Sequence, residues 1–404
     1  MADQYKEEII DPGDAASKLA KEIGFQSHSN CPAVRLVPHQ PGNFRGPVGF
    51  SWRPHILAEM AKNTPVDWVM LEEVENDGAG GKPQFFTLVG TPAVFFGLGW
   101  EIIAMTADDF ARSGRLPTVI CNELNAKRIT EKNFPLFQAA IMGYGSALRQ
   151  AGLVNITGET AIIKHSITAF CDQGADEQLV LTWGATCIGL AHRDLLIDGS
   201  KIQADMPIVG FWEPGYRCNG GTFFTNLLLR RFGPDLEKIR KNEQAMAFAE
   251  KLTIPSKSYA QTVCRIIGWN PDGSIGRPLA NIVGIAHVTG GGVWGKFGEI
   301  LPKGVGAHLT HMPKPAEVLI EGQRLSWETD LRLTDWQAYS TFHGGCGMLL
   351  VCFDVPNART VIQAAEKDGI SASIVGFTTK SGDGEILIIS RFREEKTLSS
   401  KNPE

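Results

Sequence analysis

Helical segments stand out along the chain because apolar residues recur at spacings of three and four, the period of one helix face. The clearest stripe runs from Phe137 to Ala151 and is followed by Gly152, a residue type that often ends helices. Near the start, Pro12 and Asp14 precede a similar stripe and are typical of a helix N-terminus. The pattern predicts helices over residues 12–23, 137–151, 221–231, 235–251 and 357–367.

Continuous apolar runs predict strands, several of them buried on both faces. These runs cover residues 68–74, 153–156, 179–190, 207–212, 348–353, 370–377 and 385–390. Two further apolar stretches are Phe85–Val89 and Trp100–Met105. By contrast, residues 29–64 are rich in proline and glycine and predict loop, and the charged end from Glu394 predicts disorder.

The length of 404 residues is enough for two domains of ordinary size, each with its own core. The polar, turn-like segment Asp198–Ile202 predicts the boundary between them. We therefore expect an N-terminal domain over residues 1–197, a C-terminal domain over 198–393 and a charged tail over 394–404. Apolar residues make up 43% and charged residues 21%, which is typical of a soluble globular protein.

Charge and cysteine content narrow the classes of function. The net charge of −5 argues against a nucleic-acid partner, which would favour a basic chain. No run of about 18 apolar residues predicts a membrane span, and no secretory signal is apparent. Eight cysteines without a Cys-x-x-Cys pair argue against a zinc site or a disulfide scaffold. We expect a cytoplasmic protein.

Candidate chemistry in the C-terminal half centres on residues 287–292, where an apolar run leads into His287, Thr289 and three glycines. Consecutive glycines let backbone N–H groups approach a ligand closely, and successive N–H groups can form an anion-binding nest. His287 could donate hydrogen bonds or transfer a proton near neutral pH. The simpler interpretation is a tight strand-to-helix turn around a buried histidine.

A second candidate, residues 77–82, follows a predicted strand in the N-terminal half. Asp77 could hold Mg²⁺, the glycines could admit phosphate oxygens to the backbone, and Lys82 could neutralise them. The same Asn-Asp-Gly sequence is also typical of a hairpin turn between two apolar runs. Residues 87–92 are an alternative candidate for this phosphate-binding loop, but they contain neither the aspartate nor the lysine.

Further acids lie at the ends of other predicted elements. Asp108 and Asp109 end one apolar run, and Glu159 follows a short strand. Three clustered carboxylates repel one another unless cations balance them, so such a set favours bound Mg²⁺. The alternative for Asp108 and Asp109 is a solvated helix cap.

The order of these motifs resembles that of the aminoimidazole ribonucleotide synthetases, the phosphoribosylformylglycinamidine cyclo-ligases of purine biosynthesis. The resemblance extends over nearly the whole chain, from Tyr5 to Phe377. It includes Tyr5, Lys6, Asp11 and Gly13 at the start and the glycine-rich segment 43–50. Its other segments are residues 77–82, 108–117, 158–161, 215–221, 255–259, 287–292, 301–306 and 341–348.

The resemblance implies an α+β fold with two α/β-layered domains, an N-terminal ATP-binding domain and a C-terminal mixed-sheet sandwich domain. It implies a homodimer with active sites in clefts near the interface, and ATP and Mg²⁺ as cofactors. The implied activity is ATP-dependent ring closure of formylglycinamidine ribonucleotide to aminoimidazole ribonucleotide. ATP activates the formyl amide oxygen as a phosphate ester, and a neighbouring nitrogen then closes the imidazole ring and expels phosphate.

The site residues that the resemblance implies fall into four groups. The catalytic residues would be His287, Asp109 and Lys82. ATP and its phosphates would be bound by Asp77, Gly78, Gly80, Lys82, Asp108, Glu159 and Thr160. Substrate would be bound by Asn219, Gly220, Thr289, Gly290, Gly291 and His343, and the metal by Asp77, Asp109 and Glu159.

Four positions depart from the family pattern: Gly81, Thr157, Cys218 and His343. These departures keep open a catalytically altered or silent, ligand-binding member of the same superfamily. Other branches are less similar. The selenophosphate synthetases need a reactive cysteine in a context that Cys31 lacks, and the hydrogenase-maturation branch ends in a carrier cysteine.

Overall fold

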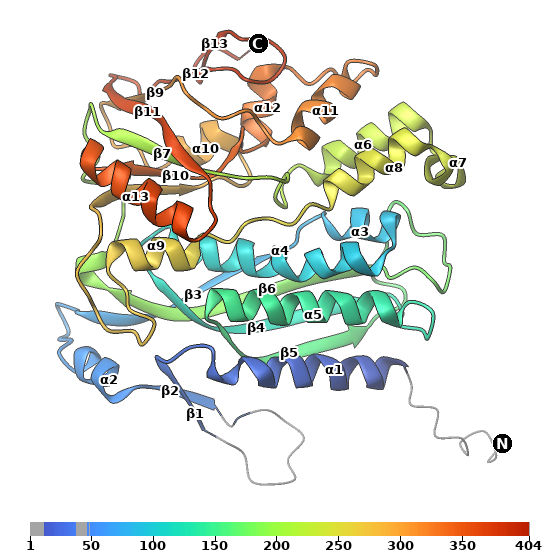
Figure 1. Cartoon of the computed structure of the whole chain (residues 1–404), viewed down its shortest axis with the longest axis horizontal. Helices are drawn as coiled ribbons and strands as arrows, with labels where there is room; N and C mark the ends of the chain where they lie inside the picture. Colours follow the sequence, from blue (N-terminus) through green and yellow to red (C-terminus); the bar gives the residue numbers. More distant parts are fainter. Residues whose placement is uncertain (1–11, 38–46, 48, 404) are drawn as a thin grey trace.

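The computed structural model describes residues 12–37, 47 and 49–403, and every structural statement below refers to these residues. They form a four-stranded sheet, a seven-stranded sheet and a two-stranded sheet, with helices packed on the two larger ones (Figure 1). The predicted α+β fold is confirmed. Expectations for Tyr5, Lys6, Asp11 and most of residues 43–50 lie outside the described residues.

The N-terminal half is built on a sheet with the strand order β3-β6-β4-β5. Its strands are β3 (Met70–Gly78), β4 (Leu116–Ala126), β5 (Val154–Ile162) and β6 (Leu181–His192). Strands β4 and β5 are parallel and the other pairs antiparallel. Helices α4 (Pro92–Ala111) and α5 (Phe134–Ala151) cover one face of the sheet, and α1 (Pro12–Gln26) lies along β5 (Figure 1).

Helix α4 is apolar on nearly all sides because it is enclosed by the sheet, by α5 and by α9 (Ala260–Ile267). Its crossing with α5 is tight, since a Cβ on Gly143 would lie 1.8 Å from the carbonyl oxygen of Phe96. Only glycine permits this approach. The crossing fixes where the last turn of α4 presents Asp108 and Asp109.

The C-terminal half is built on a sheet with the order β13-β12-β9-β11-β7-β10-β8. Neighbouring strands are antiparallel except β12 and β9. The strands are β7 (Pro207–Trp212), β8 (Ile282–His287), β9 (Val305–Leu309), β10 (Cys346–Cys352), β11 (Ala372–Lys380), β12 (Ile386–Ile389) and β13 (Thr397–Ser399).

Strand β10 shows why this sheet reads as continuous apolar runs in the sequence: all of its residues are buried. Leu349 and Val351 point into one core, and Met348 and Leu350 point into another. That second core also contains residues of α4, α5 and the N-terminal sheet. The two halves of the chain therefore share a continuous hydrophobic core.

The remaining helices pack around this framework. Helices α3, α6, α8 and α11 enclose a separate aromatic-rich core, and α13 covers one face of the C-terminal sheet (Figure 1). Their bounds, with those of α7, α10 and α12, are α3 (Pro83–Val89), α6 (Gly221–Phe232), α7 (Leu236–Lys241), α8 (Glu243–Leu252), α10 (Gly292–Gly298), α11 (Glu317–Ser326), α12 (Asp335–Thr341) and α13 (Val355–Lys367).

Three local predictions are wrong. Residues 29–64 are not all loop, because they contain a short 3₁₀ turn, Ser27–Ser29, at their edge and then β1 (Val34–Val37), β2 (Gly49–Trp52) and α2 (Pro54–Met60). The single helix expected over residues 235–251 is divided into α7 and α8, because the Asn242 side chain caps the second one. Residues 85–89 are helical rather than the second arm of a hairpin, because Pro83 starts α3.

The predicted disorder from Glu394 is also wrong. Strand β13 pairs with β12, and Leu398 is buried in the core of the C-terminal sheet. The expected domain boundary at residue 198 falls between a 3₁₀ turn, Arg193–Leu195, and β7. Helix α9, which follows this boundary in the chain, packs on the N-terminal helix α4, so the division into two domains stays a prediction.

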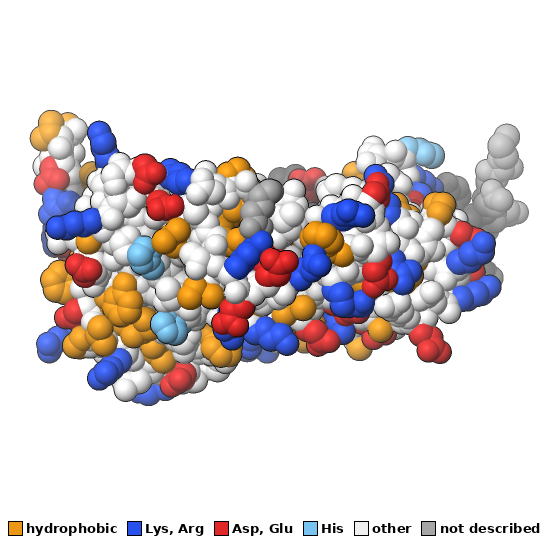
Figure 2. Space-filling view, turned by 90° about the horizontal axis from the view of Figure 1, so that it is seen from above, with side chains coloured by type: hydrophobic (Ala, Val, Ile, Leu, Met, Phe, Trp, Pro, Cys, Tyr) orange, Lys and Arg blue, Asp and Glu red, His pale blue; other side chains and the backbone are white. Residues whose placement is uncertain are grey.

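The outer surface is mixed in character. Figure 2 views the molecule from the side of the C-terminal strands and shows acidic and basic side chains interspersed, with hydrophobic side chains gathered toward one end. Within the described residues, no helix combines the length and the apolar character that crossing a bilayer requires.

Candidate functional site

Three glycine-rich turns from distant parts of the chain come together where the two halves meet. They are the turn after β3 (residues 78–82), the turn before α6 (218–221) and the turn before α10 (289–292). A Cβ on Gly80 would lie 2.9 Å from the carbonyl oxygen of Cys218, and one on Gly290 would lie 3.3 Å from Oδ1 of Asn219. The glycines thus allow these turns to approach one another closely, whereas the sequence predicts that the close approach is that of a ligand.

The predicted substrate residues Asn219, Gly220, Thr289, Gly290 and Gly291 belong to two of these turns. Asn219 Nδ2 is buried and has no hydrogen-bond partner. A buried unused donor is costly unless something accepts from it. The turn before α6 also presents the free N–H groups of a 12-residue helix, a favourable place for a phosphate.

Two predicted acids meet next to these turns. The carboxyl groups of Asp77, at the end of β3, and Asp109, in the last turn of α4, lie within hydrogen-bonding reach of each other. Burial raises the pKa of Asp77 to about 6, opposed by the Gly78 N–H and assisted by the charge of Asp109. Burial also acts to raise the pKa of Asp109, but its hydrogen bond to His287 and the charge of Arg112 outweigh it and lower that pKa.

The rival loop does not reach this place. Leu88 is buried in the aromatic-rich core, and Gly90 and Thr91 link α3 to α4. Asp77, by contrast, contacts Asp109 directly. The structure therefore puts residues 77–82, and not 87–92, beside the acids.

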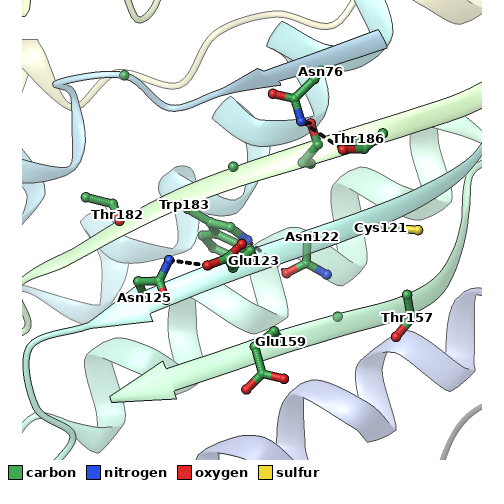
Figure 3. A pocket seen from close by; sticks show the side chains of 14 residues that line it. Asn76, Cys121, Asn122, Glu123, Asn125, Thr157, Glu159, Thr182, Trp183 and Thr186 are labelled. Carbon is green, nitrogen blue, oxygen red and sulfur yellow. Dashed lines mark hydrogen bonds between the residues drawn. The ribbon is translucent and has the colours of Figure 1, made fainter. Parts of the chain in front are cut away.

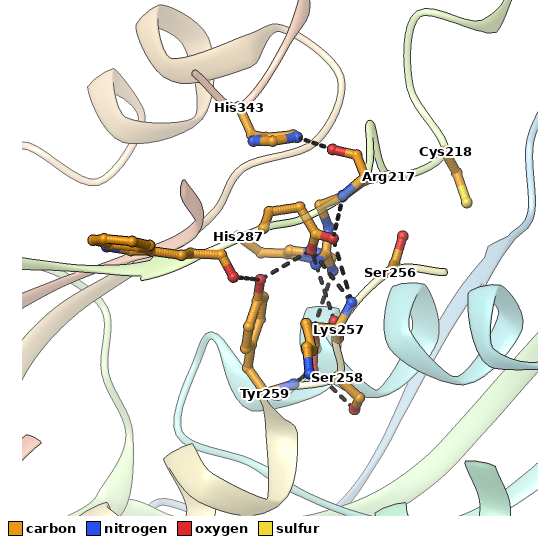
Figure 4. A network of polar contacts seen from close by, with 12 residues as sticks. Arg217, Cys218, Ser256, Lys257, Ser258, Tyr259, His287 and His343 are labelled. Carbon is orange, nitrogen blue, oxygen red and sulfur yellow. Dashed lines mark hydrogen bonds and ion pairs between the residues drawn. The ribbon is translucent and has the colours of Figure 1, made fainter. Parts of the chain in front are cut away.

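His287 is at the centre of a buried polar network that joins the halves (Figure 4). Its Nδ1–H donates to Asp109 Oδ1 at 2.8 Å, and Arg217 Nη2 donates to its Nε2 at 2.6 Å. Burial lowers the pKa of His287 to about 4, assisted by the Arg217 charge and opposed by Asp109. The imidazole is therefore neutral at pH 7, and both of its nitrogens are occupied.

Arg217 is the residue that sequence reasoning missed. Its guanidinium donates to Glu213 Oε2 at 2.5 Å, to Asp108 Oδ2 at 3.0 Å and to the carbonyl oxygen of Lys257 at 3.1 Å. Its side chain is 1% exposed, and its backbone has a φ of +60°, which is rare for a residue with a side chain. A positive φ cannot be recognised in a sequence unless the residue is glycine or asparagine.

Asp108 has a structural role in addition to this ion pair. Its Oδ1 accepts from the backbone N–H groups of Tyr259 and Ala260, at 2.7 and 2.8 Å, at the start of α9. Burial raises its pKa to about 7, against the opposing effect of Arg217. Because the side chain is fully buried, the structure gives it a capping and pairing role in place of the expected contact with ATP.

Lys82 also differs from its prediction. Its ammonium is fully buried and donates to Glu101 Oε1 at 2.6 Å and to the carbonyl oxygen of Ile254 at 2.7 Å. Glu101 also accepts from the Ser256 hydroxyl at 2.6 Å. Lys82 is therefore a member of an enclosed ion pair instead of an exposed phosphate ligand, because burial obliges it to find a carboxylate partner within the protein.

His343, expected at the substrate, is 1% exposed and held by the backbone on both sides. Its Nε2–H donates to the carbonyl oxygen of Gly215 at 2.9 Å, and its Nδ1 accepts from the Gly345 N–H at 3.1 Å. Burial lowers its pKa to about 3. These contacts stabilise the turn that carries Arg217 and Asn219, so His343 supports that turn from behind.

Glu159 and Thr160 lie elsewhere, on β5. Thr160 lies beside the core residue Leu124 on one face of the four-stranded sheet, and Glu159 is at the opposite, open face. A cavity of about 580 Å³ there is lined by polar side chains that include Asn76, Asn122, Glu123 and Glu159 (Figure 3). Gly80 also lines this cavity, so it adjoins the turn after β3. No group of three or more His, Cys, Asp or Glu suited to a metal ion occurs within the described residues, so the expected set of Asp77, Asp109 and Glu159 is not assembled.

Comparison with known proteins is consistent with this two-part architecture. The family model "AIR synthase related protein, N-terminal domain" matches residues 73–191, and the corresponding C-terminal domain model matches residues 275–389. Together the two models cover more than half of the chain.

Among curated relatives, a phosphoribosylformylglycinamidine cyclo-ligase of Acetivibrio thermocellus is 25% identical over 377 residues, covering 90% of this chain and 98% of the relative. The enzyme of the same name from Methanocaldococcus jannaschii is 26% identical over 306 residues, covering 75% and 77%.

Among solved structures, a hydrogenase maturation protein HypE in complex with ATP has a TM-score of 0.54 at 15% identity, covering 87% of this chain and 90% of that one. The HypE of E. coli has a TM-score of 0.52 at 14% identity, covering 96% and 98%. At these identities, the structural likeness concerns the fold alone.

Proposed function

We propose, on the premise that this chain belongs to the AIR synthase related protein family, that it uses ATP to activate a small nucleotide substrate where the three glycine-rich turns meet. The specific reaction that we propose is the ring closure of formylglycinamidine ribonucleotide to aminoimidazole ribonucleotide. The observation that carries the proposal is the convergence of these turns, from both halves of the chain, beside the paired carboxyl groups of Asp77 and Asp109.

The charges at this place favour a bound cation. Asp77 and Asp109 face each other, and Asp109 lies at the C-terminal end of α4, where the helix dipole adds further negative potential. A positive group, Arg112, lies close by, with its Nε 3.3 Å from Asp109 Oδ1. Mg²⁺ is commonly held by one or two carboxylates with substrate phosphates completing its coordination. Two acids are therefore a sufficient protein contribution, and Glu159 is not needed in that set.

The substrate phosphate would be bound by the turn before α6. Asn219 Nδ2 supplies the unused donor, and the first N–H groups of α6 supply more. The backbone at Gly290 and Gly291 closes the same place from the other side. When bound, ATP supplies a phosphoryl group that turns the substrate's amide oxygen into a leaving group. The protein residues hold the two reactants and the charges in position.

The role that we propose for His287 is to fix Asp109. The sequence suggests a hydrogen-bonding or proton-transferring group at the reacting amide, but both ring nitrogens already have partners. A neutral imidazole that donates to Asp109 leaves that carboxylate charged and oriented toward Asp77. His287 would then act on the reaction through Asp109.

One observation favours a second candidate, a silent ligand-binding member of the superfamily. Lys82, the lysine expected at the phosphates, has its ammonium bound by Glu101 and by the Ile254 carbonyl group. Without an exposed lysine, the turn after β3 offers only backbone N–H groups to neutralise phosphate. Such a protein would bind ATP and release it unchanged.

One experiment separates these possibilities. The purified protein is given Mg²⁺-ATP with and without formylglycinamidine ribonucleotide, and ADP and the imidazole product are quantified. We expect both products only when both substrates are present, and Asp109→Asn should reduce their formation about 100-fold or more. Asp330→Asn, which removes an exposed acid, is the matched control.

Calorimetric titration with Mg²⁺-ATP completes the test. Tight ATP binding without ADP formation would establish the silent alternative, and absence of both binding and turnover would overturn the proposal. The expected homodimer stays a proposal as well, and light scattering on the eluted protein measures it directly.

A further inference from the structure

A cavity of about 570 Å³ lies in the C-terminal half, apart from the three glycine-rich turns. It is an open cavity lined by α10, α12, the loops 301–304 and 382–384, Ile386 of β12, and Ser400 and Lys401. None of the residues that line it belongs to the turn at residues 289–292. Its volume is typical of small-molecule sites.

Two tryptophans define one wall of this cavity. The rings of Trp294 and Trp336 lie 6.3 Å apart between centroids, with 27° between their planes. The indole N–H of Trp294 donates to the carbonyl oxygen of Trp336, and that of Trp336 donates to the carbonyl oxygen of Ser399. Both rings are therefore fixed. Trp294 is only 9% exposed and Trp336 is partly buried, so Trp336 offers a ligand the larger apolar surface.

Glycines keep the space beside these rings open. A Cβ built on Gly295, Gly304 or Gly382 would meet no heavy atom within 4 Å. Gly295 lies within α10 at a negative φ, so its conformation does not require glycine. A glycine inside a helix costs about 1 kcal/mol relative to alanine. The space that it leaves is part of the cavity.

The rim carries positive charge. Lys303 and Lys401 line the cavity and are exposed, and Asp383 is the acid among the lining residues. Asp383 accepts a hydrogen bond from the Ser381 hydroxyl at 2.8 Å, and its pKa is lowered first by that bond and also by the charge of Lys401. Two ammonium groups against one carboxylate leave a net positive rim.

We propose that this cavity binds a small molecule that combines a flat heteroaromatic ring with a phosphate, the chemistry of a nucleoside monophosphate. The ring lies against the tryptophan surfaces, where stacking on a fixed aromatic side chain is favourable. The phosphate lies at the rim between Lys303 and Lys401. This site is additional to the proposed ATP and substrate site.

The test follows the two tryptophans directly. The protein is labelled with 5-fluorotryptophan, and the fluorine signals of Trp294 and Trp336 are assigned with Trp294→Phe and Trp336→Phe. Three probes are titrated: AMP, adenosine without the phosphate, and ribose 5-phosphate without the ring. We expect AMP to shift both signals saturably, adenosine to do so with about tenfold weaker affinity, and ribose 5-phosphate to leave them unchanged.

Substitutions then locate the binding. Gly295→Leu should fill the cavity and abolish the AMP-induced shifts, whereas Gly295→Ala should retain folding and most of the affinity. Lys303→Gln combined with Lys401→Gln should bring the affinity for AMP to that for adenosine, and Lys367→Gln, a change at an exposed lysine on α13, should not.

The outcomes are decisive in either direction. The proposal is overturned if AMP leaves both signals unchanged at millimolar concentration, if ribose 5-phosphate acts as strongly as AMP, or if Gly295→Leu binds AMP like the original chain. Asp109→Asn leaves this site intact, so failure of the proposed ring closure and failure of this site are separate results.

Discussion

The buried network around Arg217 and the open face of the four-stranded sheet place similar polar groups in opposite environments. In the network, the side chains of Arg217, Asp108 and Glu213 are at most 1% exposed and each pairs with another (Figure 4). On the sheet face, Glu159 is exposed and lines an open cavity (Figure 3). Two acids from different family motifs thus have different roles: Asp108 is part of the framework, and Glu159 lies on a surface that ligands can reach.

This difference changes what each acid can do. A charge inside the network is stabilised by partners that water cannot replace, so removing one partner leaves another unpaired in a poor solvent. A charge on the sheet face is hydrated and screened by salt, so its removal costs little. Substitutions in the first region should therefore affect folding, and substitutions in the second should affect binding.

The largest effect is expected for Arg217→Met. This change leaves Asp108 and Glu213 buried without their cation and removes the donor to His287 Nε2. Loss of one partner of a buried ion pair costs about 3–5 kcal/mol, and we expect the upper end of that range. Urea unfolding measures the change in the free energy of unfolding.

The matched control is Arg230→Met, since Arg230 pairs with Asp330 on the surface. An exposed pair contributes about 0–1 kcal/mol. If both variants lost the same small amount of stability, the contrast between an enclosed network and a hydrated surface would be refuted.

The next effect is expected for Lys82→Met, which leaves Glu101 buried beside Ser256 without its ammonium partner. We expect a loss of about 3 kcal/mol in unfolding free energy, with part of it recovered in Lys82→Met/Glu101→Gln. A double-mutant cycle in urea measures both. If Lys82 were instead a phosphate ligand, the variant would remain stable and would lose affinity for ATP.

A smaller, pH-dependent effect is expected for His343→Asn. Burial lowers the pKa of His343 to about 3, so the unfolded chain takes up this proton first, near pH 6.5. The contribution of neutral His343 to stability is therefore complete above pH 6.5 and is lost as the pH falls toward 3. Between pH 7 and pH 5, the original chain should lose about 2 kcal/mol more than the variant.

Unfolding curves at the two pH values check this sign. Equal losses in the two proteins would show that His343 is not the titrating group, and a larger loss in the variant would contradict its neutral, buried state.

Local structure was largely predictable from the sequence. The helix that ends before Gly152 and the strand Pro207–Trp212 agree with their predictions because each depends on a short-range pattern. The nearness of Asp77 and Asp109 was also expected, because the order of the motifs resembles that of a family in which both residues would bind one metal ion.

The partners of buried charges were not predictable. Lys82 donates to Glu101 and to the carbonyl oxygen of Ile254, 172 positions away in the chain. The sequence around a lysine that follows glycines does not indicate whether the lysine binds a phosphate or a carboxylate. The sequence predicts disorder where β13 forms, for a similar reason. Its charged surroundings favour disorder, but Leu398 is buried by strands that the local pattern does not reveal.

The smallest change in stability is expected for Glu159→Gln. Glu159 on β5 lies beside Glu123 on β4 in the strand register, and like charges on neighbouring strands are mildly unfavourable. Without ligand, the variant should be as stable as the original chain or more stable by about 0.3 kcal/mol. Mg²⁺-ATP should reverse this order if the cavity on the sheet face receives the nucleotide, because a cation would then be balanced by Glu159. Melting temperatures with and without Mg²⁺-ATP measure both states, and Glu366→Gln, at an exposed position of α13, is the control. An equal rise in melting temperature for Glu159→Gln and the original chain would show that the nucleotide does not bind beside Glu159, which leaves the site proposed at Asp77 and Asp109.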